Sequence, residues 1–447
     1  MKRTFTLLMV MICWGIISSA NAQTKNDGKA QEVKYRRSSL HMIIIEDAGL
    51  IKADLIKDAF FKGPLPDKYN DHSLPGRSFQ PKNYPLTDAE KSTVKAQSGF
   101  GKSMSGIASN ATGGLVDTTN TRYLPMIIDK YFVKEHIARD LVSKWFNRSA
   151  TGTFDMKLIG DRGSYNASEM EANIAKSSAR GLASISDAGE ELIGNTFVVV
   201  NRLNYVNKAE IGQAANKVMG AVGGMFGGYV KLATDVASAG VEMAAKGYVV
   251  RTTSYLYQLV WNDSVAAVFY QNLWIDNSNP DMKKKDAYDQ TNLFTLKFIG
   301  SETAWADVQS SVFSNKSEDD LVRKATINAV DAVIAKLQKK YEVFKTKTPL
   351  FTGFPITAKI GLKEDLEAGD KFEVLEQTID EKTGKTTYVS KGKIKVEKNR
   401  IWDNRYTAGL EQKADSKAVG PDGAPLDRTY FTGGKDYYAG MLIRQIK

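Results

Sequence analysis

Two runs of β-branched and aromatic residues, 196–206 and 248–260, constrain the fold of this chain more than any other feature. Such residues favour strands that pack on a core. The segment between them, 207–247, is rich in glycine and alanine and poor in aromatic residues. Most connections in compact domains run about 4–6 residues, so an insert of roughly 40 is unusual. We therefore expect two neighbouring strands of one sheet, joined by an insert whose composition needs its own explanation.

The first 22 residues have the pattern of an export signal. Lys2 and Arg3 precede the apolar stretch 7–17, which is short for a bilayer span, and 20–22 is a small-residue cleavage site. Cys13 is the one cysteine and lies inside this signal. We therefore expect an exported protein of the periplasm or the outer-membrane periphery, whose mature chain has neither a disulfide nor a thiolate metal site.

The charge balance is mildly basic. Of the 61 Lys and Arg residues two lie in the signal, so 59 basic residues remain against 51 acidic ones, a net charge of +8. Basic runs such as 283–285 are short and lack interleaved aromatic residues, which argues against nucleic-acid binding. The excess predicts a solvated surface, and a surface that faces anionic lipid or sugar polymer is the alternative.

The order of expected elements indicates an α+β fold, with an N-terminal region at 23–124 after the signal at 1–22. This region is expected to contain α and β elements with long loops. Its expected elements are a buried strand at 38–45, an amphipathic helix at 51–61, a loop at 63–85 and a charged helix at 87–96.

The central domain, 125–345, is expected to be an α/β sandwich with a mixed sheet and a Gly/Ala-rich helical insert. Its expected elements are a helix at 127–146 with Val133, Ile137, Leu141 and Trp145 on one face, a strand at 154–159, helices at 168–182 and 187–193, the two opening strands, an Asn262–Asp263 hairpin turn, a strand at 265–274, a polar loop at 276–292, a strand at 293–299 and a helix capped by Ser317. The last segment, 346–447, alternates as short strands and predicts a small β-barrel-like domain of about five strands.

This order resembles the periplasmic domain of the curli secretion channel family and the related domain of flagellar assembly protein T. In those proteins a strand ends in a Glu/Asp–Arg pair, which Asp161–Arg162 is similar to. Asn262–Asp263 is similar to the family's two-residue turn, and 361–372 is similar to its end domain. The resemblance covers roughly residues 125–400 and implies a role in envelope assembly or secretion.

The chain also departs from that family. Asn201 stands where the family has a glycine. Channel members insert a β-hairpin into the membrane at the place of 207–247, and such hairpins need alternating strands of about 9–11 residues. The insert lacks that alternation, the mature chain lacks an acylated cysteine, and 276–292 is too charged and short for a second hairpin. A pore is therefore not expected.

Candidate chemistry is sparse. Residues 96–103 spell a relaxed phosphate-loop pattern without a preceding buried strand, so a flexible loop is the simpler interpretation. His41, His72 and His136 have no second ligand at metal spacing. Glu46–Asp47 follows a predicted strand and could supply paired carboxylates for acid–base work or simply form a turn. The sequence therefore predicts no catalytic residue, no cofactor, no nucleotide and no metal.

The insert is the strongest candidate for a partner contact. Small residues let two backbones approach closely, and each glycine costs a helix about 1 kcal/mol relative to alanine, so we expect the insert to form fully only against a partner. A helical excursion packed on its own sheet is the alternative. The expected contact residues are Gly220, Gly223, Gly224, Met225, Phe226, Gly227, Gly228, Val236, Gly240 and Met243.

These features favour a non-catalytic cell-envelope component for assembly, scaffolding or secretion. It would act by oligomerisation with itself or by docking to other envelope proteins, with peripheral membrane contact. Two alternatives belong to other classes: an envelope hydrolase that uses Glu46 or Asp47, and a polysaccharide-binding protein that uses exposed aromatic residues.

Overall fold

The computed structural model describes eleven stretches of the chain, and every structural statement below concerns them. They belong to one compact unit, Val33–Lys447. The described residues are 36–48, 50, 52–93, 122–165, 189, 191–207, 247–309, 317–379, 386–406, 420 and 423–446.

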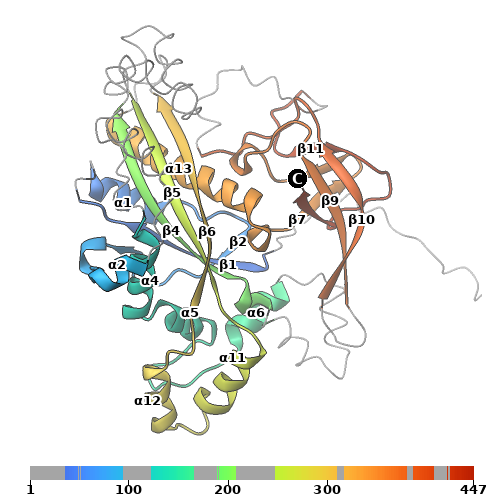
Figure 1. Ribbon diagram of the computed structural model, residues 1–447. Helices are drawn as coiled ribbons and strands as arrows, with labels where there is room; N and C mark the ends of the chain where they lie inside the picture. Colours follow the sequence, from blue (N-terminus) through green and yellow to red (C-terminus); the bar gives the residue numbers. More distant parts are fainter. Residues whose placement is uncertain are drawn as a thin grey trace, which may run out of the picture. The chain divides into compact units, whose positions relative to one another are not determined.

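A mixed sheet forms the centre of the structure (Figure 1). Strand β1 (Ser38–Ile45) lies between β4 (Thr196–Asn207) and two short strands, β2 (Tyr69–Asp71) and β3 (Ser78–Phe79), and all of these pairs are parallel. The sheet continues from β4 into β5 and β6 through antiparallel pairs. β5 is Gly247–Leu259 and β6 is Leu296–Gln309. The predicted α+β class with a mixed sheet is confirmed.

Helices cover both faces of the sheet because successive residues of a strand point to opposite faces. Leu40, Met42 and Ile44 of β1 pack on a core that includes α1 (Ala53–Lys62) and α13 (Glu318–Lys340). Ile43 and Ile45 pack on the other core. That core includes α4 (Leu124–Lys134), α5 (Ile137–Trp145), α11 (Asp263–Val268), the π-helix η2 (Phe269–Leu273) and α12 (Met282–Gln290). The N-terminal segment 36–93 thus shares one sheet and both cores with the central segment.

The strongest sequence patterns gave the right elements. Strand 38–45 and helix 51–61 correspond to β1 and α1, and the helix at 87–96 is the shorter α2 (Asp88–Thr93). The hydroxyl oxygen of Ser317 accepts a hydrogen bond from the backbone N–H of Asp320 at 3.1 Å, as expected of a helix cap. α13 ends at Lys340, and Phe344 is buried in the following 3-10 turn η3 (Glu342–Phe344).

The helix expected at 127–146 is two helices, α4 and α5. His136 adopts a left-handed conformation, with φ of 54°, between them. The break restarts the helical repeat, so the expected buried face is wrong at one position. Val133 is 71% exposed, whereas Ile137, Leu141 and Trp145 are buried.

Two expected strands are helices. The strand at 154–159 is wrong because α6 (Lys157–Tyr165) occupies its second half, and the Asp155 carboxylate accepts from the backbone N–H of Lys157 at 2.9 Å. The strand at 265–274 is wrong because α11 and η2 occupy it. Asn262 is not in a hairpin turn: its side chain caps α11 by accepting from the N–H of Val265 at 3.0 Å.

The two expected loops contain short elements. The loop at 63–85 supplies β2, β3 and the 3-10 turn η1 (Pro81–Asn83), and the loop at 276–292 contains α12. β2 and β3 are too short to show a pattern of their own, and their pairing with β1 defines them.

The C-terminal segment forms a closed barrel of six strands, in the order β10-β11-β8-β7-β12-β9 (Figure 1). The barrel-like domain is confirmed, with one strand more than expected. Its core includes Phe372, Val374, Ile394 and Phe431. The strands are β7 (Thr348–Gly353), β8 (Ile356–Ala358), β9 (Lys371–Ile379), β10 (Thr386–Val396), β11 (Thr429–Thr432) and β12 (Leu442–Ile446), with the 3-10 turn η4 (Leu362–Glu364) between β8 and β9.

Candidate functional site

The chain enters and leaves the insert at the end of a long strand pair. β4 and β5 stay in register from Phe197 opposite Gln258 to Asn207 opposite Tyr248. β1 pairs with β4 only as far as Asn201, so β4, β5 and β6 continue beyond it. We call this extension the distal arm: residues 202–207, 247–253 and 303–309 (Figure 1).

One face of the distal arm is packed against α13. Leu203, Tyr205, Val250 and Ala306 of the arm share a buried cluster with Leu321, Val322 and Ala325 of the helix. The hydroxyls of Tyr205 and Thr326 are hydrogen bonded to each other, and burial raises the pKa of Tyr205. This packing holds the base of the insert in a defined position.

The opposite face of the distal arm is polar. Arg202 donates two hydrogen bonds to the Asp47 carboxylate, at 2.6 and 3.2 Å. The hydroxyls of Thr253 and Thr303 are 3.0 Å apart across β5 and β6. Burial lowers the pKa of Arg251, which lies opposite Asn204 in the register. The arm is therefore apolar towards α13 and polar on its other face.

The predicted contact residues lie outside the described residues. The list is Gly220, Gly223, Gly224, Met225, Phe226, Gly227, Gly228, Val236, Gly240 and Met243, all within 208–246. The relaxed phosphate-loop pattern at 96–103 and the helix expected at 168–182 also lie outside them. What the structure adds is the distal arm that carries the insert.

A second candidate site lies at the carboxyl ends of β1 and β3. The chain leaves β1 for α1 on one face of the sheet and leaves β3 towards α4 on the other. Open α/β sheets commonly bind ligands at such a reversal. The residues there are Glu46 and Asp47 after β1, and Gln80 after β3.

Both carboxylates at this reversal are held in ion pairs. Glu46 accepts from Lys57 at 2.5 Å and from the Gln80 amide at 3.2 Å. The hydrogen bonds from Lys57 and Ser78 lower the pKa of Glu46 to about 2. Asp47 is bound by Arg202 instead. A general acid needs a pKa near the working pH, so this geometry gives the acid–base role no support.

The histidines have structural surroundings. Burial lowers the pKa of both His41 and His72 to about 3. His72 accepts at Nδ1 from Arg162, at 2.9 Å, so its Nε2–H donates to the Leu141 carbonyl, at 2.9 Å. His136 forms the break before α5. Within the part of the chain that the structure describes, no group of three or more His, Cys, Asp or Glu side chains could hold a metal.

Arg162 connects segments that are far apart in the sequence, which no local signal indicates. From α6 its guanidinium donates to the Ser39 hydroxyl at 3.0 Å and to the Asp71 carbonyl at 2.7 Å, besides His72. It also lies over the ring of Trp145 at 4.5 Å. The resemblance would place Arg162 at the end of a strand, but it lies in α6. It instead ties α6 to β1, to the end of β2 and to α5.

Comparison with known proteins does not assign a family to this chain. Among the described residues, no helix is both long and apolar enough to cross a membrane. No protein-family model matches the chain, and no curated protein matches it.

Proposed function

We propose that this chain is an exported, non-catalytic component of cell-envelope assembly that oligomerises or docks through its 207–247 insert. The observation that supports this proposal most is the distal arm. Three strands extend past β1, and α13 packs along them. The arm fixes the two positions, Asn207 and Gly247, at which the chain enters and leaves the insert, which suits a contact element.

The composition of the insert supports the same role. Its run Met219–Gly228 has five glycines, alanine and valine around Met225 and Phe226. Small residues allow close backbone contact, and the two larger side chains could anchor in a partner. The candidate catalytic carboxylates, by contrast, are held by Lys57 and Arg202.

The resemblance to the curli secretion channel family supports the proposal only in outline. The sandwich followed by a small barrel agrees with that order of domains. Two of the motifs take other forms, because Asp161–Arg162 lies in α6 and Asn262 caps α11. A pore is not part of the proposal.

Shortening the insert tests the proposal directly. Replacing 208–246 by a single asparagine leaves Asn–Gly247 between the paired residues Asn207 and Tyr248, a sequence that favours a two-residue hairpin turn. We expect the shortened chain to keep its fold and to lose its higher-mass complexes, measured by circular dichroism and by crosslinking in cells.

Point variants separate contact from folding in the same experiment. Phe226→Asp should weaken the complexes, whereas Val133→Asp, at a position 71% exposed on α4, should leave them unchanged. Complexes of unaltered mass from a folded, shortened chain would contradict the proposal.

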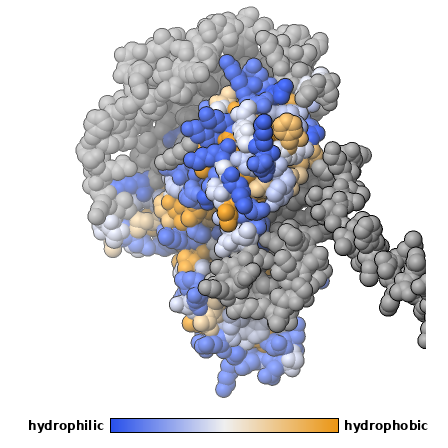
Figure 2. Space-filling view, turned by 90° about the vertical axis from the view of Figure 1, so that its right-hand side faces the viewer, coloured by the Kyte–Doolittle hydropathy of each residue, from blue (hydrophilic) through white to orange (hydrophobic). Residues whose placement is uncertain are grey.

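Polysaccharide binding is the second candidate, because the barrel exposes aromatic rings. Phe354, in the turn between β7 and β8, is 83% exposed and Tyr438 is 55% exposed. A Cβ built on Gly353 would meet the backbone of Tyr437 and Tyr438, so these two segments are in contact. The coloured residues of the face in Figure 2 are mostly hydrophilic with separate hydrophobic spots.

Co-sedimentation with insoluble peptidoglycan would measure this activity. Phe354→Ala is expected to weaken binding about tenfold, which is the loss of one good stacking contact of roughly 1.4 kcal/mol. Phe298→Ala, at a ring 43% exposed on β6, is the matched control and should bind normally. Equal retention of both variants would remove this candidate.

A further inference from the structure

The contact between α13 and the barrel is built around charged residues. On the barrel side, the charged residues are Lys363 of η4 and Asp365 directly after it. The Lys363 ammonium lies 3.8 Å from the Asp331 carboxylate of α13. Asp365 binds Lys339 of α13 at 2.8 Å. Glu364 lies 4.0 Å from Lys68, which precedes β2. The Lys363–Asp331 pair differs from the other pairs because it is the more deeply buried, with side-chain exposures of 14% and 10%.

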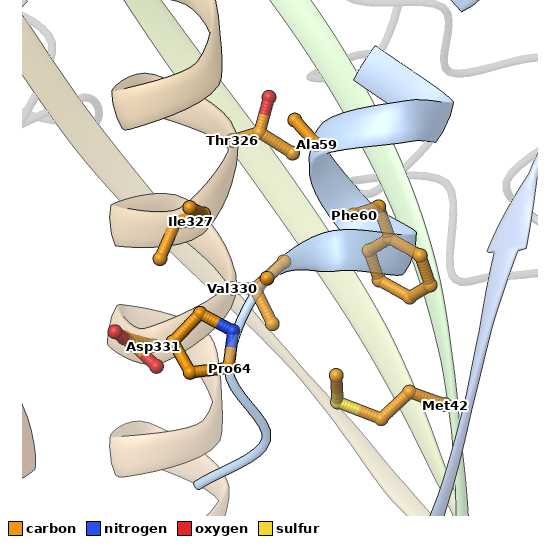
Figure 3. A pocket seen from close by; sticks show the side chains of 9 residues that line it. Met42, Ala59, Phe60, Pro64, Thr326, Ile327, Val330 and Asp331 are labelled. Carbon is orange, nitrogen blue, oxygen red and sulfur yellow. The ribbon is translucent and has the colours of Figure 1, made fainter. Parts of the chain in front are cut away.

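Asp331 is an acidic residue among the buried residues of α13. It lies on the buried side of α13, next to Val330 and one turn after Ile327, and is 9% exposed. Asp331, Val330 and Ile327 line a cavity of about 10 Å³. Phe60 and Pro64 line the same cavity (Figure 3). Such a volume holds about one water molecule. The cavity offers an ionised carboxylate little solvation.

Burial favours the protonated form of Asp331. Burial raises the pKa of Asp331 to about 7, Lys363 opposes this shift, and the negative charges of Glu364 and Asp67 add to it. At 3.8 Å, Lys363 is too far for a hydrogen bond that would satisfy the carboxylate. In an unfolded or opened chain, by contrast, an aspartate ionises with a pKa of about 3.9.

We propose that Asp331 is a pH-dependent switch for the contact between α13 and the barrel: the protonated side chain lets α13 and η4 pack closely, and its ionisation loosens them. The sign follows from proton binding. Between about pH 4 and pH 7 the packed form holds a proton that the opened form releases, so packing weakens as the pH rises through this range. The switch lies apart from the insert and goes beyond the proposed function.

Hydrogen exchange of the full-length chain tests this switch. Peptides that cover 326–340 and 360–366 are followed at about pH 5 and about pH 8, with correction for intrinsic exchange rates. In the unaltered chain we expect exchange to be at least about tenfold faster at the higher pH. Asp331→Asn, which stays neutral, should exchange equally at both.

Two further variants make the outcome decisive. Asp365→Asn is the matched control, because its side chain is 52% exposed on the same side of the contact, and it should keep the normal pH response. Lys363→Met removes the cation that favours the ionised carboxylate, so the midpoint of the exchange response should move to higher pH. This second variant tests the proposal even if Asp331→Asn does not fold. An unchanged pH response in Asp331→Asn, or an unmoved midpoint in Lys363→Met, would overturn the proposal.

Discussion

Arg162→Ala is expected to lower the free energy of unfolding by about 2–4 kcal/mol, the largest effect of a single truncation that we foresee. The guanidinium donates to Ser39, to His72 and to the Asp71 carbonyl. Its removal leaves the buried Nδ1 of His72 without its donor and uncovers one face of Trp145. Truncation thus disconnects α6 from the sheet and from α5.

Urea denaturation at neutral pH measures this loss. Asp161→Ala is the matched control, because Asp161 is the preceding residue of α6 and is exposed. We expect it to change the free energy of unfolding by less than about 0.5 kcal/mol. Equal effects of the two variants would show that Arg162 does not connect these segments.

Asn201→Leu is expected to lower the free energy of unfolding by about 2–4 kcal/mol. The substituted residue lies directly before the distal arm. Asn201 is buried at the last β1–β4 pair. Its side-chain amide donates to the carbonyls of Ile43 and Val199 at 3.1 and 3.2 Å, and its oxygen accepts from the Ser254 hydroxyl at 2.6 Å. One side chain therefore binds three adjacent strands where the arm begins.

A double variant separates the lost hydrogen bonds from the change of shape. In Asn201→Leu/Ser254→Ala neither member of the Asn–Ser pair remains, so no hydroxyl is left buried without its acceptor. We expect the double variant to be less destabilised than Asn201→Leu alone, by thermal and urea unfolding. If the second substitution instead adds its own full cost, the network is not the cause.

The sequence alone predicted the elements whose pattern is long and regular. β1, β4 and β5 are rich in β-branched residues, and α13 has a cap, an apolar stripe and charged ends. Short apolar runs failed, because a buried helix and a buried strand have the same composition. In the run 265–274, the buried Phe269 of η2 lies among Phe146, Phe154 and Trp261.

The key polar residues could not be found from the sequence because their partners are distant. Arg162 meets residues 39, 71, 72 and 145, which only the folded chain brings together. Asp331 looks like an ordinary solvated residue of a long helix until η4 packs on it. The expected insert contacts rest on composition and position, and the distal arm supplies the position.

The most direct test of the central claim is site-specific photocrosslinking in whole cells. A photoreactive residue at position 226, in the insert, is compared with one at position 133, which is 71% exposed on α4. If the insert is a contact element, position 226 yields a discrete adduct with a second copy or another envelope protein, and position 133 does not. A correctly exported chain that gives no adduct at 226, while the control position does, would contradict the account.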